Sequence, residues 1–191
     1  MKSLCLLFLS VACAAVWAQT NAPAAKPEQE IVITADSGRF DGKTSQMVYL
    51  GHVLVTDNVK AQLYCGQLTV DLPPDGGHPT NIVAEADLIV TNVVIDYLDG
   101  KGQTNHITAN KAIYAYNVVA GRIGAVTNET VTFTGGTPMP KVEKGQVIIT
   151  GEPLIFDVAE KSFTGSHYKT ILKQAPKSGN DTNASPFNFL K

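Results

Sequence analysis

Short runs in which apolar and polar residues alternate recur along most of the chain. Leu68 and Val70 alternate with polar neighbours, and the run 154–158 has the same period, with Leu154 and Phe156 on one side. A period of two is typical of a β-strand whose two faces meet different surroundings. The pattern therefore predicts a sheet that turns an apolar face toward an interior and a mostly polar face toward water.

The alternation divides the central part of the chain into short strands rather than helices. Turns rich in glycine, proline and aspartate separate the strands. The segment 111–116 also fits a helix, but its two tyrosines and the valines that follow favour a strand. The predicted strands are 31–35, 47–56, 67–72, 82–90, 93–97, 107–116, 126–133, 146–150, 154–158 and 168–172, and the predicted turns are 41–42, 73–77, 99–102, 135–136 and 143–145.

The composition supports an all-β protein and narrows the classes of function. Hydrophobic residues make up 44% of the 191 residues and charged residues only 17%, so most of the chain should fold. Valine, isoleucine and threonine, which suit pleated strands, are abundant. The formal net charge is −2, which argues against a nucleic-acid binder because such proteins need a basic surface.

The two ends of the chain differ from its centre. Lys2 precedes an uncharged apolar run that closes with Val16-Trp17-Ala18, the pattern of a secretory signal peptide cleaved after Ala18. The run is too short for a membrane anchor, which needs about 20 residues, and a lipoprotein modified at Cys13 stays an alternative. We expect a signal peptide at 1–18, a flexible leader at 19–30, one β domain at 31–173 and a disordered tail at 174–191.

An internal repeat runs through the expected β domain. The sequence I-T-A-D at 33–36 returns as I-T-A-N at 107–110, and in both copies an aromatic residue follows four positions later. Each copy continues with a β run that ends near glycine and then with a glycine-led strand that ends in aspartate. This order indicates duplicated β units, which stack so that each covers the apolar face of its neighbour.

No motif for metal binding or catalysis stands out. The four histidines lie far apart in the sequence, and the spacings HExxH and CxxC are absent. Cys65 remains the lone cysteine after signal cleavage, and its strand-like setting indicates a buried structural residue. We expect no enzyme, no cofactor and no metal, although any fold could bring together the carboxylate pair of a carbohydrate-active enzyme.

The first copy of the repeat and its continuation carry a family resemblance. The segments ITADSGRFD (33–41), YLGHVLVTD (49–57), LYCGQLTVDLP (63–73) and NIVAEADLIV (81–90) resemble the OstA-like domain of the LptA family of periplasmic lipopolysaccharide-transport proteins. The resemblance covers about 31–157, and in the second copy Asn110 replaces the aspartate. It implies an elongated, V-shaped β-jellyroll of many short antiparallel strands built from repeated units.

The same resemblance implies a function. It implies a non-catalytic protein of the periplasm that takes part in outer membrane biogenesis, binds the acyl chains of lipid A and carries lipopolysaccharide from the inner to the outer membrane. The implied partners are lipopolysaccharide itself and LptC-like and LptD-like jellyroll domains that stack on edge strands. A head-to-tail homo-oligomer is also implied, and nucleic acid is not expected.

Inward apolar side chains would then form the lipid-binding surface. Each buried CH₂ group contributes about 0.8 kcal/mol, so an acyl chain gains strongly from an apolar trough. The alternatives are a secreted structural or adhesive β-repeat domain with a filled core and a carbohydrate-active enzyme. A continuous apolar trough that is open at both ends would distinguish the carrier from both. The candidate lipid-lining residues are Ile33, Val53, Val55, Leu68, Val70, Ile82, Ala84, Leu88, Phe133, Leu154 and Phe156.

Overall fold

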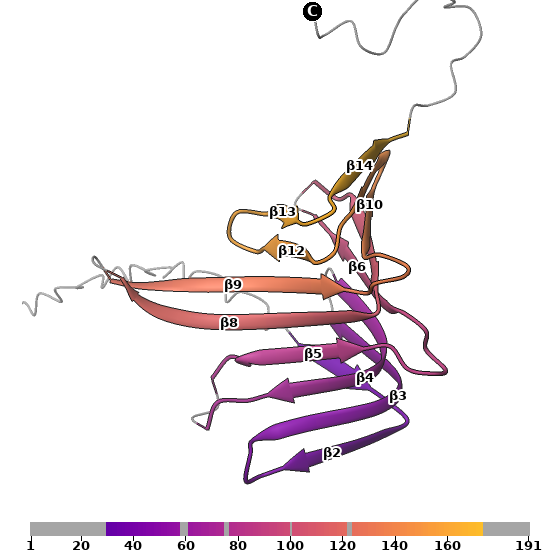
Figure 1. Ribbon diagram of the computed structural model, residues 1–191. Coiled ribbons are helices and arrows are strands. Elements are labelled where there is room, and N and C mark those ends of the chain that lie inside the picture. The colour runs from indigo at the N-terminus through magenta and orange to yellow at the C-terminus, as the bar shows by residue number, and fades with distance from the viewer. Residues whose placement is uncertain (1–29, 58–60, 75–76, 100, 122–123, 174–191) are drawn as a thin grey trace, which may run out of the picture.

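The computed structural model describes residues 30–57, 61–74, 77–99, 101–121 and 124–173. Throughout these residues the regular structure is β, in one 14-stranded antiparallel sheet (Figure 1). No helix in the described ranges is long and apolar enough to cross a membrane. The predicted all-β fold is confirmed, whereas the predicted signal peptide, the tail and the leader up to residue 29 lie outside the described residues.

The strands are short except for four that exceed ten residues. They are β1 (Ile31–Thr34), β2 (Ser37–Asp41), β3 (Gln46–Asp57), β4 (Ala61–Asp71), β5 (Asn81–Glu85), β6 (Val93–Leu98), β7 (Thr104–Ala109), β8 (Lys111–Gly121), β9 (Gly124–Thr134), β10 (Lys141–Lys144), β11 (Val147–Thr150), β12 (Leu154–Asp157), β13 (Ser162–Gly165) and β14 (Lys169–Leu172).

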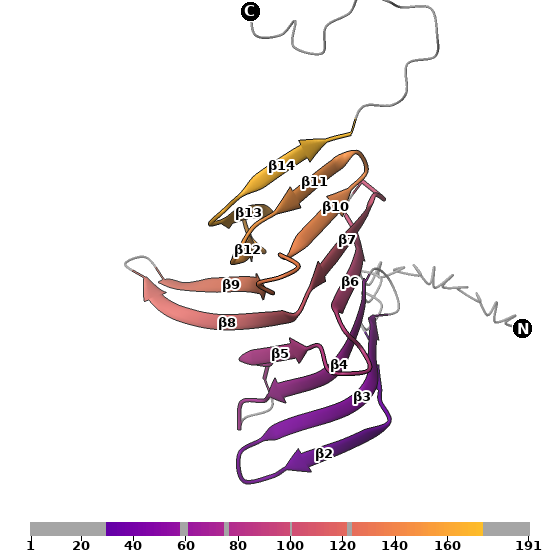
Figure 2. The ribbon, with the colours of Figure 1, turned by 45° about the vertical axis from the view of Figure 1, so that its right-hand side comes forward.

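The sheet is folded along one line into two walls that open like a book. The first wall runs β2, β3, β4, β5, β8, β9, β12, β13, and the second runs β1, β3, β4, β6, β7, β10, β11, β14. Strands β3 and β4 bend and belong to both walls. In Figures 1 and 2 the chain rises along both walls from the indigo N-terminal strands to the yellow C-terminal ones. The molecule is thus an elongated, V-shaped β-jellyroll, as expected.

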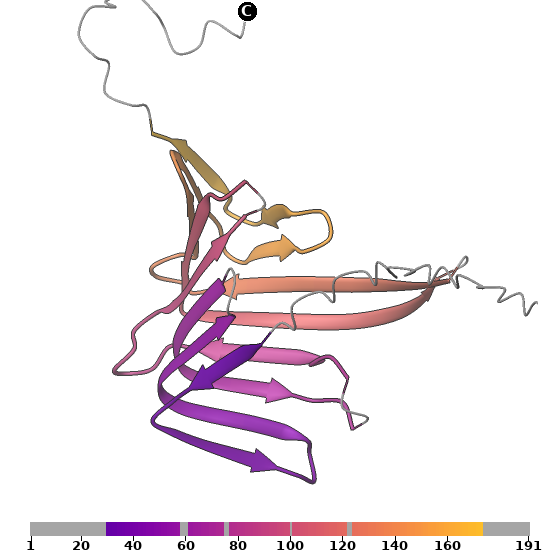
Figure 3. The same cartoon turned by 180° about the vertical axis from the view of Figure 1, so that it is seen from behind.

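The walls meet at a row of residues that we call the crease, defined as Asp36, Gly51, Gly66, Asp87, Asn110, Gly135 and Glu152. At the crease the pairing of β3 with β4 shifts in register, and Gly51 has a left-handed φ of 74°, which glycine adopts at little cost. A Cβ atom on Gly66 would lie 2.3 Å from the carboxyl carbon of Asp87. Glycine therefore lets β3 and β4 turn from one wall into the other, as Figure 3 shows from behind.

Carboxylates of the crease bond the backbone where the chain changes walls. Asp87 Oδ1 accepts hydrogen bonds from the N–H groups of Ile89 and Val90 at 2.8 and 2.6 Å, and these bonds hold the pKa of Asp87 below its usual value. Glu152 Oε2 accepts from the N–H groups of Gly135 and Gly136, both at 2.9 Å. Donors at a bend lack partners in the sheet, so these bonds stabilise the crease.

The two copies of the sequence repeat form equivalent bends. Asp36 lies between β1 and β2, and Asn110 lies between β7 and β8. The N–H of Asp36 donates to the carbonyl of Gly51 at 3.0 Å, and the N–H of Asn110 donates to the carbonyl of Thr134 at 3.1 Å. In both copies, I-T-A-(D/N) marks the point where the chain passes from the second wall to the first.

The bends also explain where the predicted strands are wrong. The alternation predicts one strand over 82–90, whereas β5 ends at Glu85 because the chain turns into the second wall at Asp87. It predicts one strand over 107–116, whereas Asn110 divides that segment into β7 and β8. Strands β2, β10 and β13 are missing from the predicted set because each carries a single large apolar side chain.

The buried core lies inside the V, next to the crease. Side chains of both walls meet there, and Val53, Leu154 and Phe133 are almost completely buried. Half-buried apolar side chains extend this cluster away from the crease. The buried members are Val53, Cys65, Leu68, Val70, Ala84, Val93, Ile107, Ala109, Ala112, Phe133, Val142 and Leu154.

Candidate functional site

The inner face of the V brings together all but one of the candidate lipid-lining residues. They come from six strands, four in the first wall (β4, β5, β9 and β12) and two in the second (β1 and the second half of β3), and they meet because cross-strand partners share one face of a sheet. The alternation in β4 and β12 therefore identifies the inner face correctly. The residues in this apolar cluster are Ile33, Val53, Val55, Leu68, Val70, Ile82, Ala84, Phe133, Leu154 and Phe156.

Leu88 does not face the interior. It lies in the bend between β5 and β6, and 99% of its surface is exposed. The alternation that placed it inside requires the strand to continue past Glu85, and the turn at Asp87 ends that strand. Leu88 therefore has to be removed from the set of inner-face residues.

The apolar inner face reaches both ends of the molecule. At the N-terminal end, Ile31 shares the inner face of β1 with Ile33, and Phe40 pairs with Met47 of the cluster; both Ile31 and Phe40 are exposed. At the C-terminal end, Leu172 of β14 pairs with Val147 and is exposed as well. Apolar side chains are thus present on the inner face at both end strands as well as in the core between them.

A cavity of about 670 Å³ opens between the walls toward the C-terminal end. Val142 and Ile149 line it from the second wall, and Phe156 and Phe163 line it from the first. The ring centroids of Phe156 and Phe163 lie 4.7 Å apart, and the ring centroid of Tyr97 lies 6.3 Å from that of Phe156. These tilted aromatic contacts give the cavity a largely apolar wall that remains only partly buried.

Polar groups border the same cavity at its mouth, away from the crease. Asn105 is buried there, and Lys144 forms an ion pair with Asp99 at 2.7 Å. The hydrogen bond from Lys144 and the backbone N–H groups of Gln103 and Lys101 lower the pKa of Asp99 to about 2. Asp99 is therefore charged at neutral pH and fixes the turn that joins β6 to β7.

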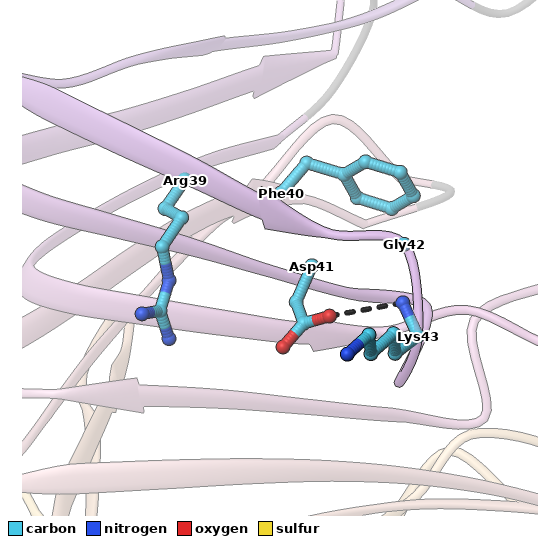
Figure 4. A pocket seen from close by; sticks show the side chains of 5 residues that line it. All are labelled: Arg39, Phe40, Asp41, Gly42 and Lys43. Atoms are coloured by element: carbon cyan, nitrogen blue, oxygen red, sulfur yellow. Dashed lines mark hydrogen bonds between the residues drawn. The ribbon is translucent and has the colours of Figure 1, made fainter.

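Two other hollows differ from this cavity in the residues that line them. A hollow of about 460 Å³ surrounds the β2–β3 turn, where Asp41 Oδ1 accepts a hydrogen bond from the N–H of Lys43 at 2.9 Å (Figure 4). In the same view Arg39 and Asp41 point to one side of β2 and Phe40 to the other. A further hollow of about 620 Å³ is lined by Thr108 and Lys141, on the outer face of the second wall. Neither combines an aromatic interior with a charged mouth.

The cysteine and histidine side chains discussed below belong to the buried core or lie on the outer face. In the described part of the chain no three histidine, cysteine or acidic side chains gather into a metal site. Burial raises the pKa of Cys65 to about 12, so it remains a protonated thiol. His106 Nδ1 lies 2.6 Å from Asp96 Oδ1, and both side chains alternate with Ile95 and Ile107 of the interior. The inner face therefore offers mainly apolar contact.

Comparisons with known proteins agree with this geometry at the level of the fold. No family model matches the sequence, and no curated protein shows significant similarity to it. Among solved structures, the chain is similar to LptH from Pseudomonas aeruginosa, described as the LptA-homologous periplasmic component of the conserved lipopolysaccharide transport device. The TM-score is 0.59 at 15% identity, over 77% of this chain and 97% of the other. At this identity the likeness shows a shared fold.

Proposed function

We propose that the protein is a non-catalytic periplasmic carrier that binds lipopolysaccharide by its acyl chains and bridges the inner and outer membranes. The observation that carries this proposal is the apolar inner face, which runs between both end strands and opens into the cavity beside Phe156 and Phe163. A structural repeat with a filled core would not need such a cavity. The fold shared with LptH supports the same function.

The physical requirement is to keep several acyl chains out of water across an aqueous space. At about 0.8 kcal/mol for each CH₂ group, a chain of a dozen carbons disfavours water by roughly 10 kcal/mol. Apolar side chains inside the V replace water around the chains, and the open side leaves the sugar headgroup hydrated. No bond is made or broken, so the protein needs no catalytic residue.

The end strands suit the proposed contacts with other jellyroll domains. Strands β1 and β2 border the walls at one end, and β13 and β14 border them at the other. An edge strand has backbone groups free to pair with a further strand. LptC-like and LptD-like domains, or further copies in a head-to-tail oligomer, would thereby continue the trough. A signal peptide at 1–18 would deliver the protein to the periplasm.

Photo-crosslinking can test the proposed function at two neighbouring residues. Phe156 faces the cavity, whereas Ile155 pairs with Thr132 and Thr164 on the opposite face of β12. We expect a photoreactive amino acid at Phe156 to capture lipopolysaccharide in cells, and the same group at Ile155 to capture little. Equal capture at both positions, or none at either, would contradict a carrier and favour a structural or adhesive domain with a filled core.

A further inference from the structure

The inner face of the second wall changes from apolar to polar along three neighbouring strands, β6, β7 and β10. In β10, Val142 is 1% exposed, and Lys144 lies two residues further toward the mouth on the same face. In β7, Ile107 pairs with Val142 and Asn105 pairs with Lys144. In β6, Tyr97 pairs with Asn105, and Asp99 follows two residues later. The cavity therefore has an apolar floor and a polar border, the arrangement that an amphipathic ligand requires.

Cations predominate at that border and lie on both walls. Lys101 and Lys144 belong to the second wall, Lys161 belongs to the β12–β13 turn of the first, and all three line the cavity. Lys144 is neutralised by Asp99. Lys101 and Lys161 form no ion pair with any described residue. Two lysines without an ion pair among the described residues thus line one cavity, one from each wall.

Nearby acidic side chains do not neutralise these lysines. Glu143 alternates with Val142 and Lys144 and lies on the outer face, where Lys141 pairs with it at 2.8 Å. Asp157 alternates with Phe156, and its Oδ1 accepts the N–H of Glu160 at 2.8 Å. Glu160 is exposed in the same turn as Lys161 and does not line the cavity.

We propose that Lys101 and Lys161 bind the phosphate groups of a phosphorylated glycolipid whose acyl chain occupies the cavity between Phe156 and Val142. This inference rests on the proposed function and gives it a chemical specificity. A lysine ammonium recognises phosphate as a point charge. The cavity volume of about 670 Å³ falls in the range of roughly 300–1,000 Å³ that is usual for sites of small ligands.

The test compares two lipids that differ only in phosphate. The wild-type protein is titrated with diphosphorylated lipid A, with the dephosphorylated form of the same lipid and with inorganic phosphate alone. We expect a preference of roughly tenfold for the phosphorylated lipid, as two solvent-exposed ion pairs would provide. The preference should fall as salt concentration rises, because salt screens exposed charges.

Matched variants assign the preference to the two lysines. The double variant Lys101→Gln/Lys161→Gln should bind both lipids alike, and Lys101→Arg/Lys161→Arg should keep the preference. Lys169→Gln is the control, since Lys169 pairs with Thr150 on the outer face of the second wall. Its preference should equal that of the wild type.

The outcomes separate this inference from the proposed function. If the wild type binds neither lipid, the carrier function itself is wrong. If it binds both lipids alike and the glutamine variant changes nothing, the carrier stands and the assignment of the lysines is overturned. If inorganic phosphate alone binds as tightly as the lipid, the mouth is a simple anion site and the coupling to an acyl chain is overturned.

Discussion

The crease and the mouth of the V use the same strands for different purposes. Near the crease, side chains of both walls fill the space between them, and Phe133 is only 2% exposed. Toward the mouth, the walls diverge, and Phe156 and Phe163, although packed against each other, border a cavity on one side. The contrast arises from geometry, because walls that meet at an angle can be filled by their own side chains only where they are close.

Residues of one strand therefore serve two purposes: those near the crease contribute to stability, and those near the mouth contribute to ligand binding. In β12, Leu154 is buried at the crease and Phe156, two residues further on the same face, lines the cavity. A substitution near the crease should therefore act on folding, and one near the mouth should act on ligand binding.

The largest effect is expected from a charge placed in the packed core next to the crease. Leu68 is 2% exposed and packs with Val53 and other buried residues, so Leu68→Asp would bury an unpaired carboxylate. Such a charge costs several kcal/mol, a large part of the total stability of about 5–15 kcal/mol that is usual for a domain. We expect the variant to lose its cooperative unfolding transition in circular dichroism. A stable, folded variant would show that the crease holds water or is open to ligand.

The alternation along β4 predicts that Leu68 faces inward, but it cannot distinguish a filled position from a lining one. That distinction depends on the distance between the walls, which no single strand encodes. For the same reason the sequence does not indicate that Lys101 and Lys161, which lie in turns far apart in the sequence, line one cavity; they do so because β6 and β12 lie close together. The alternation predicts that Leu88 faces inward, because a period of two does not indicate that the chain turns at Asp87.

Substitution of two phenylalanines, one near the crease and one near the mouth, should have a smaller effect on stability. Phe133→Ala should lower the free energy of unfolding by about 3–5 kcal/mol, since it leaves a cavity in a packed core. Phe163→Ala should cost less, because Phe163 already borders open space, but it should weaken the binding of lipid. Urea denaturation and lipid titration of both variants measure the two effects. Phe40→Ala, at a phenylalanine that is 59% exposed, is the control for loss of a ring; equal destabilisation at all three positions would refute the division.

A smaller effect is expected from acid at the mouth. Asp99 has a pKa of about 2 in the folded protein against an ordinary value of 3.8. Because the folded-state pKa is lowered, its contribution to stability is complete above pH 3.8 and is lost as the pH falls toward 2. Asp99→Asn should therefore flatten the acid decline of stability over this window and release Lys144 from its ion pair. Thermal unfolding at several pH values measures this effect, and parallel profiles for variant and wild type would contradict it.

The smallest perturbation uses the thiol of Cys65 to report on the crease without changing the protein. Its pKa of about 12 against an ordinary 9.0 implies on the order of a thousandfold less thiolate at neutral pH than in an unfolded chain. In protein lacking residues 1–18, which contain Cys5 and Cys13, a thiol reagent should react slowly until denaturant is added. Lipid bound at the mouth should leave this rate unchanged, because the crease is filled by the protein itself. A lipid that accelerates or blocks the reaction would show that acyl chains reach the crease, and the division between the two regions would then fail.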